Sequence, residues 1–248
     1  MEKLVQKKKT GGLLDTLKTV FWAIVIALLV RTFAFEPFNI PSGSMIPTLL
    51  VGDYLFVSKF SYGYSKHSMP FSLPVIPGRI FETEPERGDV VVFKLPSDTS
   101  QDYIKRVIGL PGDTVQVTNG RLYINNKLVE RERIEDYILT DGTGRSAAVP
   151  QYLETLPNGK VHRILELFGD QGPSDNTEAF TVPEGHYFMM GDNRDNSADS
   201  RAFPSRFRFV PIENLVGRAE FLFYSKDSSQ PVYDLGSIRF DRLFQGVH

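Results

Sequence analysis

The hydrophobic pattern of the chain begins with one long apolar run near the N-terminus. The run TVFWAIVIALLV covers residues 19–30, and further apolar residues extend it to about 13–35. A helix needs roughly 20 apolar residues to cross a bilayer, so the run spans only if its flanks take part. Lys18 and Arg31 can extend their charged ends toward the headgroups. We therefore expect residues 13–35 to form a membrane anchor. A cleaved signal peptide with a site at Thr32–Ala34 and a buried core helix are the alternatives.

Positive charge precedes this apolar run. Lys3, Lys7, Lys8 and Lys9 all lie within residues 1–12. Because positively charged flanks stay in the cytoplasm, we expect these residues to form a cytoplasmic basic tail. Everything after the anchor is then expected on the opposite side of the membrane.

After residue 36 the pattern changes to short runs of β-branched and aromatic residues, separated by Gly, Pro, Asn or Asp. Such runs are typical of strands. The Asn125-Asn126 pair is expected to form the turn of a hairpin. No long helical periodicity is present after the apolar run, so the fold is predicted to be mainly β, as a barrel or a sandwich. The predicted strand regions are 54–64, 88–96, 102–117, 120–129, 185–192 and 217–225.

Two segments interrupt this strand pattern. Residues 66–81 are apolar yet rich in Pro and Gly, which predicts a loop with exposed apolar residues, at the lipid interface or packed over the barrel. Residues 114–183 carry polar and charged sequence and are predicted to form an inserted subdomain. The catalytic β core would then comprise residues 36–113 and 184–248.

Composition excludes several classes of function. The chain has 248 residues, of which 41% are hydrophobic and 23% charged, as in an ordinary globular protein. Its net charge of −2 gives no basic footprint, so no nucleic-acid partner is expected. The absence of cysteine excludes disulfides, thiolate metal sites and cysteine catalysis.

Candidate nucleophiles lie in NIPSGSMIPTLLVGD, residues 39–53, where Ser42 and Ser44 flank Gly43. The sequence offers these serines no familiar base. No serine stands in a G-x-S-x-G elbow and no lysine follows a serine by three residues. None of the four histidines, His67, His162, His186 and His248, shows a triad spacing.

Lysine is the remaining candidate base, and DYIKRVIGLPGD contains Lys105. Strand alternation places Lys105 with Tyr103 on one face and Ile104 with Arg106 on the other. A solvated surface lysine is the ordinary alternative, because only about one lysine in a few thousand is neutral at pH 7. Bringing the pKa to about 7–8 requires roughly 3–4 kcal/mol against the charged form. Lys105 must therefore be desolvated and lack a carboxylate partner if it acts as a base.

A third polar segment, GDNRDNSADSR, covers residues 191–201. Its alternating acids suggest a calcium loop, but the EF-hand pattern does not fit. Counted from Asp192, Arg194 occupies a ligand position; counted from Asp195, Ser200 replaces the required glycine. A plain polar surface loop remains the alternative.

Four segments together resemble bacterial signal peptidase I, the membrane-bound serine–lysine endopeptidase that removes signal peptides from exported preproteins. The segments are PSGSMIPTL, RGDVVVFKLP, DYIKRVIGLPGD and GDNRDNSADSR, in this order behind the apolar run. The resemblance covers the anchor and the core from about Phe38 to Arg201, while residues 118–183 match only as a variable insert. It implies a β-barrel-like serine–lysine protease core with an inserted β subdomain and one transmembrane helix. Some relatives carry two spans, which leaves the topology open.

The resemblance also implies the roles of individual residues. Ser44 would be the nucleophile and Lys105 the general base. The Ser42 hydroxyl and the Ser44 N–H would form the oxyanion hole, and Ser197 would orient the Lys105 amine. Met45 would pack over the lysine. The implied supporting ion pairs are Arg106 with Asp192 and Asp199 with Arg201, and the residues implied to line small apolar pockets for alanine-like side chains are Phe38, Ile40, Leu55, Val92 and Ile104.

The implied partners are preproteins and membrane lipid, with no cofactor, no metal and no nucleic acid. The resemblance places the catalytic domain on the periplasmic side of a bacterial inner membrane. Three alternatives stay open: a self-cleaving repressor-type serine–lysine protease, a specialised peptidase for pilus or conjugation substrates, and an anchored envelope protein whose decayed site only binds.

Overall fold

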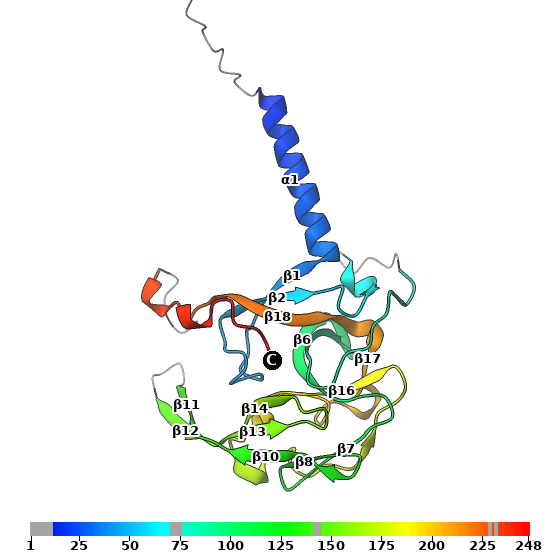
Figure 1. The fold of residues 1–248 in the computed structure, drawn as a ribbon, viewed down its shortest axis with the longest axis vertical. Coiled ribbons are helices and arrows are strands. Elements are labelled where there is room, and N and C mark those ends of the chain that lie inside the picture. The colour runs from blue at the N-terminus through cyan, green and yellow to red at the C-terminus, as the bar shows by residue number, and fades with distance from the viewer. Residues whose placement is uncertain (1–11, 70–75, 141–144, 228–229, 231–232) are drawn as a thin grey trace, which may run out of the picture.

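A long N-terminal helix, α1 (Leu13–Phe33), projects away from the β part of the molecule (Figure 1). The computed structural model describes residues 12–69, 76–140, 145–227, 230 and 233–248, so all but the last residue of the expected basic tail lies outside the described residues. The 21 residues of α1 span about 31 Å, enough to cross the hydrocarbon core of a bilayer. The most apolar stretch of α1 is not buried by any part of the protein. The core-helix alternative is therefore wrong, and the helix has the length and surface of a membrane anchor.

The main sheet has seven strands in the order β1-β2-β18-β5-β6-β16-β17, with antiparallel pairing throughout. The fold is mainly β, as predicted. Within the described residues no ladder joins the edge strands β1 and β17, so the sheet is open and a closed barrel is not confirmed. The strands are β1 (Phe35–Asn39), β2 (Asp53–Ser58), β5 (Val90–Leu95), β6 (Asp98–Gly109), β16 (His186–Met190), β17 (Val210–Pro211) and β18 (Leu215–Ser225).

Smaller sheets occupy the end of the molecule farthest from α1 (Figure 1). One sheet has the order β15-β7-β8-β9, a second has the order β10-β13-β14, and β11 pairs with β12. All of them come from residues 114–181, within the predicted insert, although the division into core and insert stays a prediction. Their bounds are β7 (Thr114–Thr118), β8 (Arg121–Ile124), β9 (Lys127–Leu128), β10 (Glu130–Arg133), β11 (Tyr137–Thr140), β12 (Ser146–Val149), β13 (Gln151–Thr155), β14 (Val161–Leu165) and β15 (Phe180–Thr181).

The predicted hairpin turn is confirmed between β8 and β9. Asn125 and Asn126 have φ values of 54° and 61°, and Ile124 pairs with Lys127 across the turn. Two consecutive residues with positive φ are what a two-residue type I′ turn requires, and asparagine tolerates that conformation well.

The segment 66–81, predicted as a loop, contains the short helix η1 (Lys66–Ser68) and the strand β4 (Arg79–Ile80), which pairs with β3 (Tyr64–Ser65). Its residues 70–75 lie outside the described residues. At its described ends, His67 and Ser68 are buried whereas Phe81 is exposed, so the segment both packs on the protein and presents an apolar side chain to the surroundings.

The alternation predicted for β6 is confirmed by its packing. Ile104 packs against a core cluster that contains Ile40, whereas Tyr103 packs against a separate cluster that contains Phe93. The backbone of Lys105 pairs with Val91 in the neighbouring β5. Lys105 is therefore held on a central strand between two packed clusters, which fixes where its side chain can reach.

Candidate active site

Ser44 and Lys105 meet although they are far apart in the sequence. Ser44 lies in the turn region between β1 and β2, and Lys105 lies on β6. The Lys105 Nζ is 2.7 Å from the Ser44 Oγ. Ser44 is 8% exposed and Lys105 is 3% exposed, so the contact is almost completely shielded from water. A hydroxyl can both donate and accept, so this contact is able to pass a proton from the serine to a neutral amine.

The surroundings of Lys105 are those that a lysine base requires, because the amine is desolvated and has no carboxylate partner among the described residues. Burial lowers the pKa of Lys105 to about 8, although the charges of Asp199 and Asp192 act in the opposite direction. At that value about one amine in ten is neutral at pH 7. Among the described residues no carboxylate forms an ion pair with the Lys105 amine, whose second hydrogen bond goes to the carbonyl of Ile104 at 2.8 Å.

A cleft of about 520 Å³ opens beside the Ser44–Lys105 contact. Ser42 lines it together with Ser44, as an oxyanion donor must. Of the five predicted substrate-binding residues, four line the cleft: Phe38, Ile40, Val92 and Ile104. Leu55 does not, which differs from the prediction. The alternation along β2 turns its side chain inward, where no part of it is exposed, whereas Ile40 and Val92 each keep a small exposed fraction.

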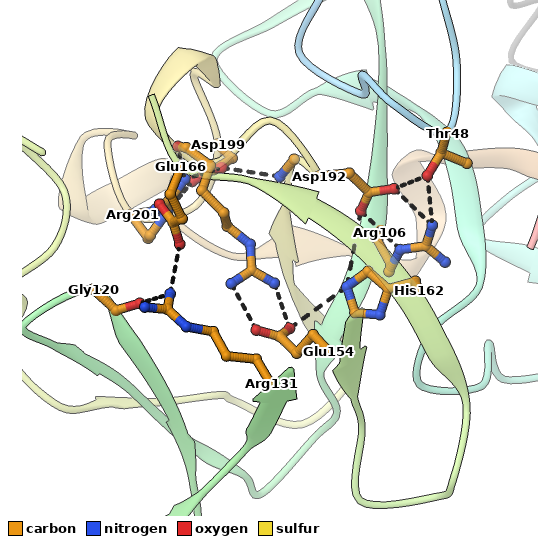
Figure 2. A network of polar contacts seen from close by, with 12 residues as sticks. Thr48, Arg106, Gly120, Arg131, Glu154, His162, Glu166, Asp192, Asp199 and Arg201 are labelled. Carbon is orange, nitrogen blue, oxygen red and sulfur yellow. Dashed lines mark hydrogen bonds and ion pairs between the residues drawn. The ribbon is translucent and has the colours of Figure 1, made fainter. Parts of the chain in front are cut away.

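Two ion pairs brace the loop that follows β16. Arg106 and Asp192 form a bidentate pair, with Nε–Oδ1 at 2.8 Å and Nη2–Oδ2 at 2.7 Å (Figure 2). Burial alone would raise the pKa of Asp192, but Arg106 lowers it below its usual value. Arg201 binds both oxygens of Asp199 in the same way, at 3.0 and 2.8 Å. Both predicted pairings are thus present in the structure, and all four side chains are buried.

The structure differs from the predicted contact between Ser197 and the lysine amine. Within the described part of the chain no hydrogen bond joins Ser197 to Lys105, because the amine is directed to Ser44 and to the backbone. Ser197 Oγ instead lies close to Gly191, where an added Cβ would stand 2.2 Å from it. Met45 is fully buried in the core cluster that contains Ile40, and its packing over the lysine stays a prediction.

Gly191 and Asn193 hold the loop that carries Ser44, a role that the sequence did not reveal. The Asn193 side chain donates to the Gly43 carbonyl at 2.9 Å, and its backbone N–H donates to the Ser44 carbonyl at 3.1 Å. A Cβ on Gly191 would lie 2.5 Å from the Ser44 carbonyl oxygen. Glycine is therefore required there for the two loops to approach each other. Both residues belong to the polar segment 191–201, but their partners lie about 150 positions earlier.

His162 was also missed as part of the site. Its Nε2 lies 3.5 Å from Glu154 Oε2 and 4.0 Å from Asp192 Oδ1, between the two carboxylates (Figure 2). Burial, followed by the charge of Arg106, lowers the pKa of His162 to about 4, so the ring is neutral at pH 7. His162 thus lies against the Arg106–Asp192 pair, and neither of its buried ring nitrogens has a hydrogen-bond partner among the described residues. The register of the β13–β14 hairpin, which pairs Glu154 with His162, was the missing signal.

Comparisons with known proteins identify the family of the chain. The model of the family described as signal peptidase, peptidase S26, matches residues 13–224. The chain is 41% identical over 251 residues to a signal peptidase I of Rickettsia canadensis, covering 93% of this chain and 92% of the relative. It is 42% identical over 247 residues to the signal peptidase I of Rickettsia typhi, covering 92% and 91%. The crystal structure of a signal peptidase I from Enterococcus faecalis is 28% identical, with a TM-score of 0.32, covering 55% of this chain and 97% of that one. On the family match and the identities to the two Rickettsia proteins, the chain belongs to the signal peptidase family, peptidase S26.

Proposed function

We propose that the signal-peptide cleavage performed by this chain uses Ser44 as the nucleophile and Lys105 as the general base. The observation that carries the proposal is the 2.7 Å contact between the two side chains in a shielded site beside a cleft. A lysine acts as a base only where burial makes its neutral form accessible, and burial lowers the pKa of Lys105 to about 8.

The reaction follows from these positions. The preprotein lies in the cleft, with small apolar side chains against residues such as Ile104 and Val92. Ser44 Oγ attacks the scissile carbonyl carbon and its proton passes to Lys105 Nζ. The resulting oxyanion accepts hydrogen bonds from the Ser42 hydroxyl and the Ser44 N–H, and donors of this kind stabilise the transition state by about 3–4 kcal/mol.

Collapse of the tetrahedral intermediate breaks the peptide bond. The protonated Lys105 gives its proton to the leaving amine, and an ester forms between Ser44 and the signal peptide. The lysine, neutral again, then takes a proton from a water that attacks this ester. The water oxygen bonds to the acyl carbon, Lys105 returns the proton to Ser44 Oγ as the ester C–O bond breaks, and the signal peptide leaves with a free carboxylate. Every proton in the cycle moves through the same amine, which is why its pKa must lie near the working pH.

The placement in the membrane is part of the proposal. With α1 as the anchor, the positive charges before it favour a cytoplasmic N-terminus. The catalytic residues would then face the periplasm from a bacterial inner membrane, where exported preproteins emerge. In this arrangement lipid contacts α1, whose apolar side chains are exposed along its length.

The direct test is to incubate the detergent-solubilised full chain with a preprotein and follow the precursor on a gel. The wild-type protein should cut it, whereas Ser44→Ala and Lys105→Met should leave it intact. Lys127→Met, which removes an exposed lysine on β9, is the matched control and should cut at the wild-type rate.

Each alternative gives a different outcome. Rapid cleavage by Lys105→Met would remove that lysine from the mechanism. A precursor left intact by the wild type would favour the binding-module alternative. Fragmentation of the wild-type chain alone, lost in Ser44→Ala, would favour a self-cleaving protease, and cleavage confined to pilin-type precursors would favour the specialised peptidase.

A further inference from the structure

Three carboxylates from separate segments meet behind the loop that lines the cleft. Glu166 follows directly after β14, Asp175 lies in the turn after the short helix η3 (Gly169–Gln171), and Asp195 lies in η4 (Arg194–Asn196). One carboxylate oxygen of each lies within 4.8 Å of the other two. Glu166 and Asp175 are each 1% exposed, and Asp195 is partly buried. The cluster is therefore an internal concentration of negative charge, not a group of solvated surface acids.

Two oxygens of this cluster have no hydrogen-bond partner among the described residues. They are Glu166 Oε2 and Asp195 Oδ1, and both atoms are buried. The second oxygen of each residue is satisfied: Glu166 Oε1 accepts from Arg131 Nη1 at 3.1 Å, and Asp195 Oδ2 accepts from the Phe168 N–H at 2.8 Å. Because buried polar atoms are nearly always satisfied, an unpartnered carboxylate oxygen nine-tenths buried points to a missing ligand.

The arginines around the cluster already have their own carboxylates. Arg131 pairs with Asp170 as well as with Glu166, as Figure 2 shows for the Glu166 contact. Arg194 binds Glu154 through both of its terminal guanidinium nitrogens, Nη1 and Nη2.

Arg201 in turn is bound to Asp199. Among the described residues only Arg131 forms an ion pair with the cluster, and Arg131 is shared with Asp170, so the three carboxylates carry more negative charge than this one cation compensates. Such charge is stable only when a proton or a metal ion neutralises it.

We propose that Glu166, Asp175 and Asp195 bind one Ca²⁺ ion. Three carboxylate oxygens form a hard donor set of the kind that Ca²⁺ and Mg²⁺ prefer. The three ligand atoms all lie within 4.8 Å of one another, so a single ion can reach all of them. Mg²⁺ demands a near-ideal octahedron and keeps several waters, whereas Ca²⁺ accepts an irregular set of oxygens. Because these ligands come from three separate segments and two of them are buried, they suit Ca²⁺ better.

The proposed site joins the end of β14 to the loop that borders the cleft. Asn196, which follows Asp195 directly, lines that cleft. The two segments already touch through the backbone, because the Leu165 N–H donates to the Asp192 carbonyl at 2.9 Å. A cation held by Asp195 and Glu166 would fasten the same junction through side chains. Its ligands are positioning residues, which keep the loop in place without touching the substrate.

The experiment measures binding and stability of the full chain in detergent after removal of metal with EDTA. Titration with CaCl₂ in a calorimeter should show saturable binding of one Ca²⁺ per chain, with weaker binding of Mg²⁺. At a hundredfold excess over its dissociation constant, Ca²⁺ should raise the unfolding midpoint by about 5–10 °C. Glu166→Gln and Asp175→Asn keep the size of the side chain and should each abolish both effects.

The matched control is Glu178→Gln, an exposed acid of the same region, which should bind Ca²⁺ as the wild type does. The wild-type titration decides whether a site exists, and the variants decide where it is. Absence of saturable binding by the wild type would overturn the proposal and leave a proton on Glu166 as the neutralising partner. Equal binding by Glu166→Gln and Asp175→Asn would also overturn it. None of these readouts depends on peptide cleavage, so failure here is distinct from failure of the Ser44–Lys105 mechanism.

Discussion

Lys105 Nζ lies 2.7 Å from Ser44 Oγ, while Asp192, one of two acids whose charges act on the amine, is bound by Arg106 through both of its oxygens. Asp199 is paired in the same way with its own arginine. The two carboxylates raise the pKa of Lys105, but burial lowers it more. The arginines thus let acids brace the loop without forming an ion pair with the amine, which would hold it in its charged form.

The first prediction concerns the pH dependence of cleavage. Because Lys105 must be neutral to accept a proton, kcat/KM should rise about tenfold per pH unit below pH 8 and level off above about 8. Initial rates on a preprotein between pH 6 and about pH 10 would measure this. A profile that keeps rising toward 10.5, the ordinary pKa of a lysine, would show a solvated amine and contradict the assignment.

The second prediction is that Lys105→Met stabilises the protein while abolishing activity. The difference between the ordinary pKa of 10.5 and the value of about 8 in the folded chain corresponds to a cost of up to about 3 kcal/mol. Below pH 8 the amine is charged in both states, so the folded state bears the full cost. The cost declines as pH rises from about 8 to 10.5, where the unfolded chain also loses the proton.

Thermal unfolding in detergent tests this second prediction. The midpoint of Lys105→Met should exceed that of the wild type by about 5–10 °C at pH 7, and the gap should narrow by about pH 10. Lys127→Met changes the same residue type at an exposed site and should leave the midpoint nearly unchanged. A lower midpoint for Lys105→Met at pH 7 would mean that its hydrogen bonds outweigh its burial.

Much of this arrangement follows from local sequence. The facing of Tyr103 and Ile104 on β6 depends only on strand alternation, and the Asn125-Asn126 turn depends on two neighbouring residues. Such features are set by backbone geometry within a few positions, so the sequence predicts them. The pairing of Ser44 with Lys105 came instead from a family resemblance, because no local rule joins residues so far apart.

The parts that could not be predicted depend on contacts between distant segments. Whether the sheet closes depends on whether its two edge strands meet in space. The spacing of the predicted strands along the sequence does not determine this. Leu55 was predicted to line the cleft, but which face of β2 is buried depends on its neighbours β1 and β18. The Glu166 cluster draws its acids from three separate segments of the chain, so no single stretch carries a metal-binding spacing.

The third prediction concerns Gly191, whose missing side chain makes room for the loop that carries Ser44. In Gly191→Ala the new methyl would lie 2.5 Å from the Ser44 carbonyl oxygen and 2.2 Å from Ser197 Oγ. Since Cβ atoms essentially never approach so closely, the loop must shift, and we expect kcat/KM to fall by roughly 100-fold. Gly12→Ala, where no atom lies within 4 Å, is the control and should keep wild-type activity. An active Gly191→Ala protein would show that the loops tolerate a wider spacing.

The fourth prediction concerns the oxyanion hole. Ser42 lines the cleft beside Ser44, and loss of one hydroxyl donor should lower kcat by about 100- to 1,000-fold. Ser42→Thr keeps the hydroxyl and should recover part of the rate. The comparison is made at saturating preprotein, so that a change in binding does not hide the effect. An unchanged kcat in Ser42→Ala would remove Ser42 from the oxyanion hole.

The fifth prediction concerns stability in acid and rests on His162. This ring faces Glu154 and Asp192, with Arg106 and Arg194 next to them, and burial is the largest cause of its pKa of about 4. Between pH 6.5 and about 4 the unfolded chain binds a proton that the folded chain does not. The free energy of unfolding should therefore fall by up to about 3 kcal/mol as pH drops through this window, and the contribution should be complete above pH 6.5.

His162→Gln removes the titrating group and keeps a polar side chain of similar reach, so its stability should change less over the same window. The unfolding midpoints of both proteins, measured in detergent at half-unit steps from about pH 7 to 4, give the comparison. His186→Gln, at a partly exposed position on β16, is the matched control and should follow the wild-type curve. If the curves of the wild type and His162→Gln ran parallel, the acid sensitivity would belong to other groups. The pKa of His162 would then be the same in the folded and the unfolded chain, which would contradict the prediction.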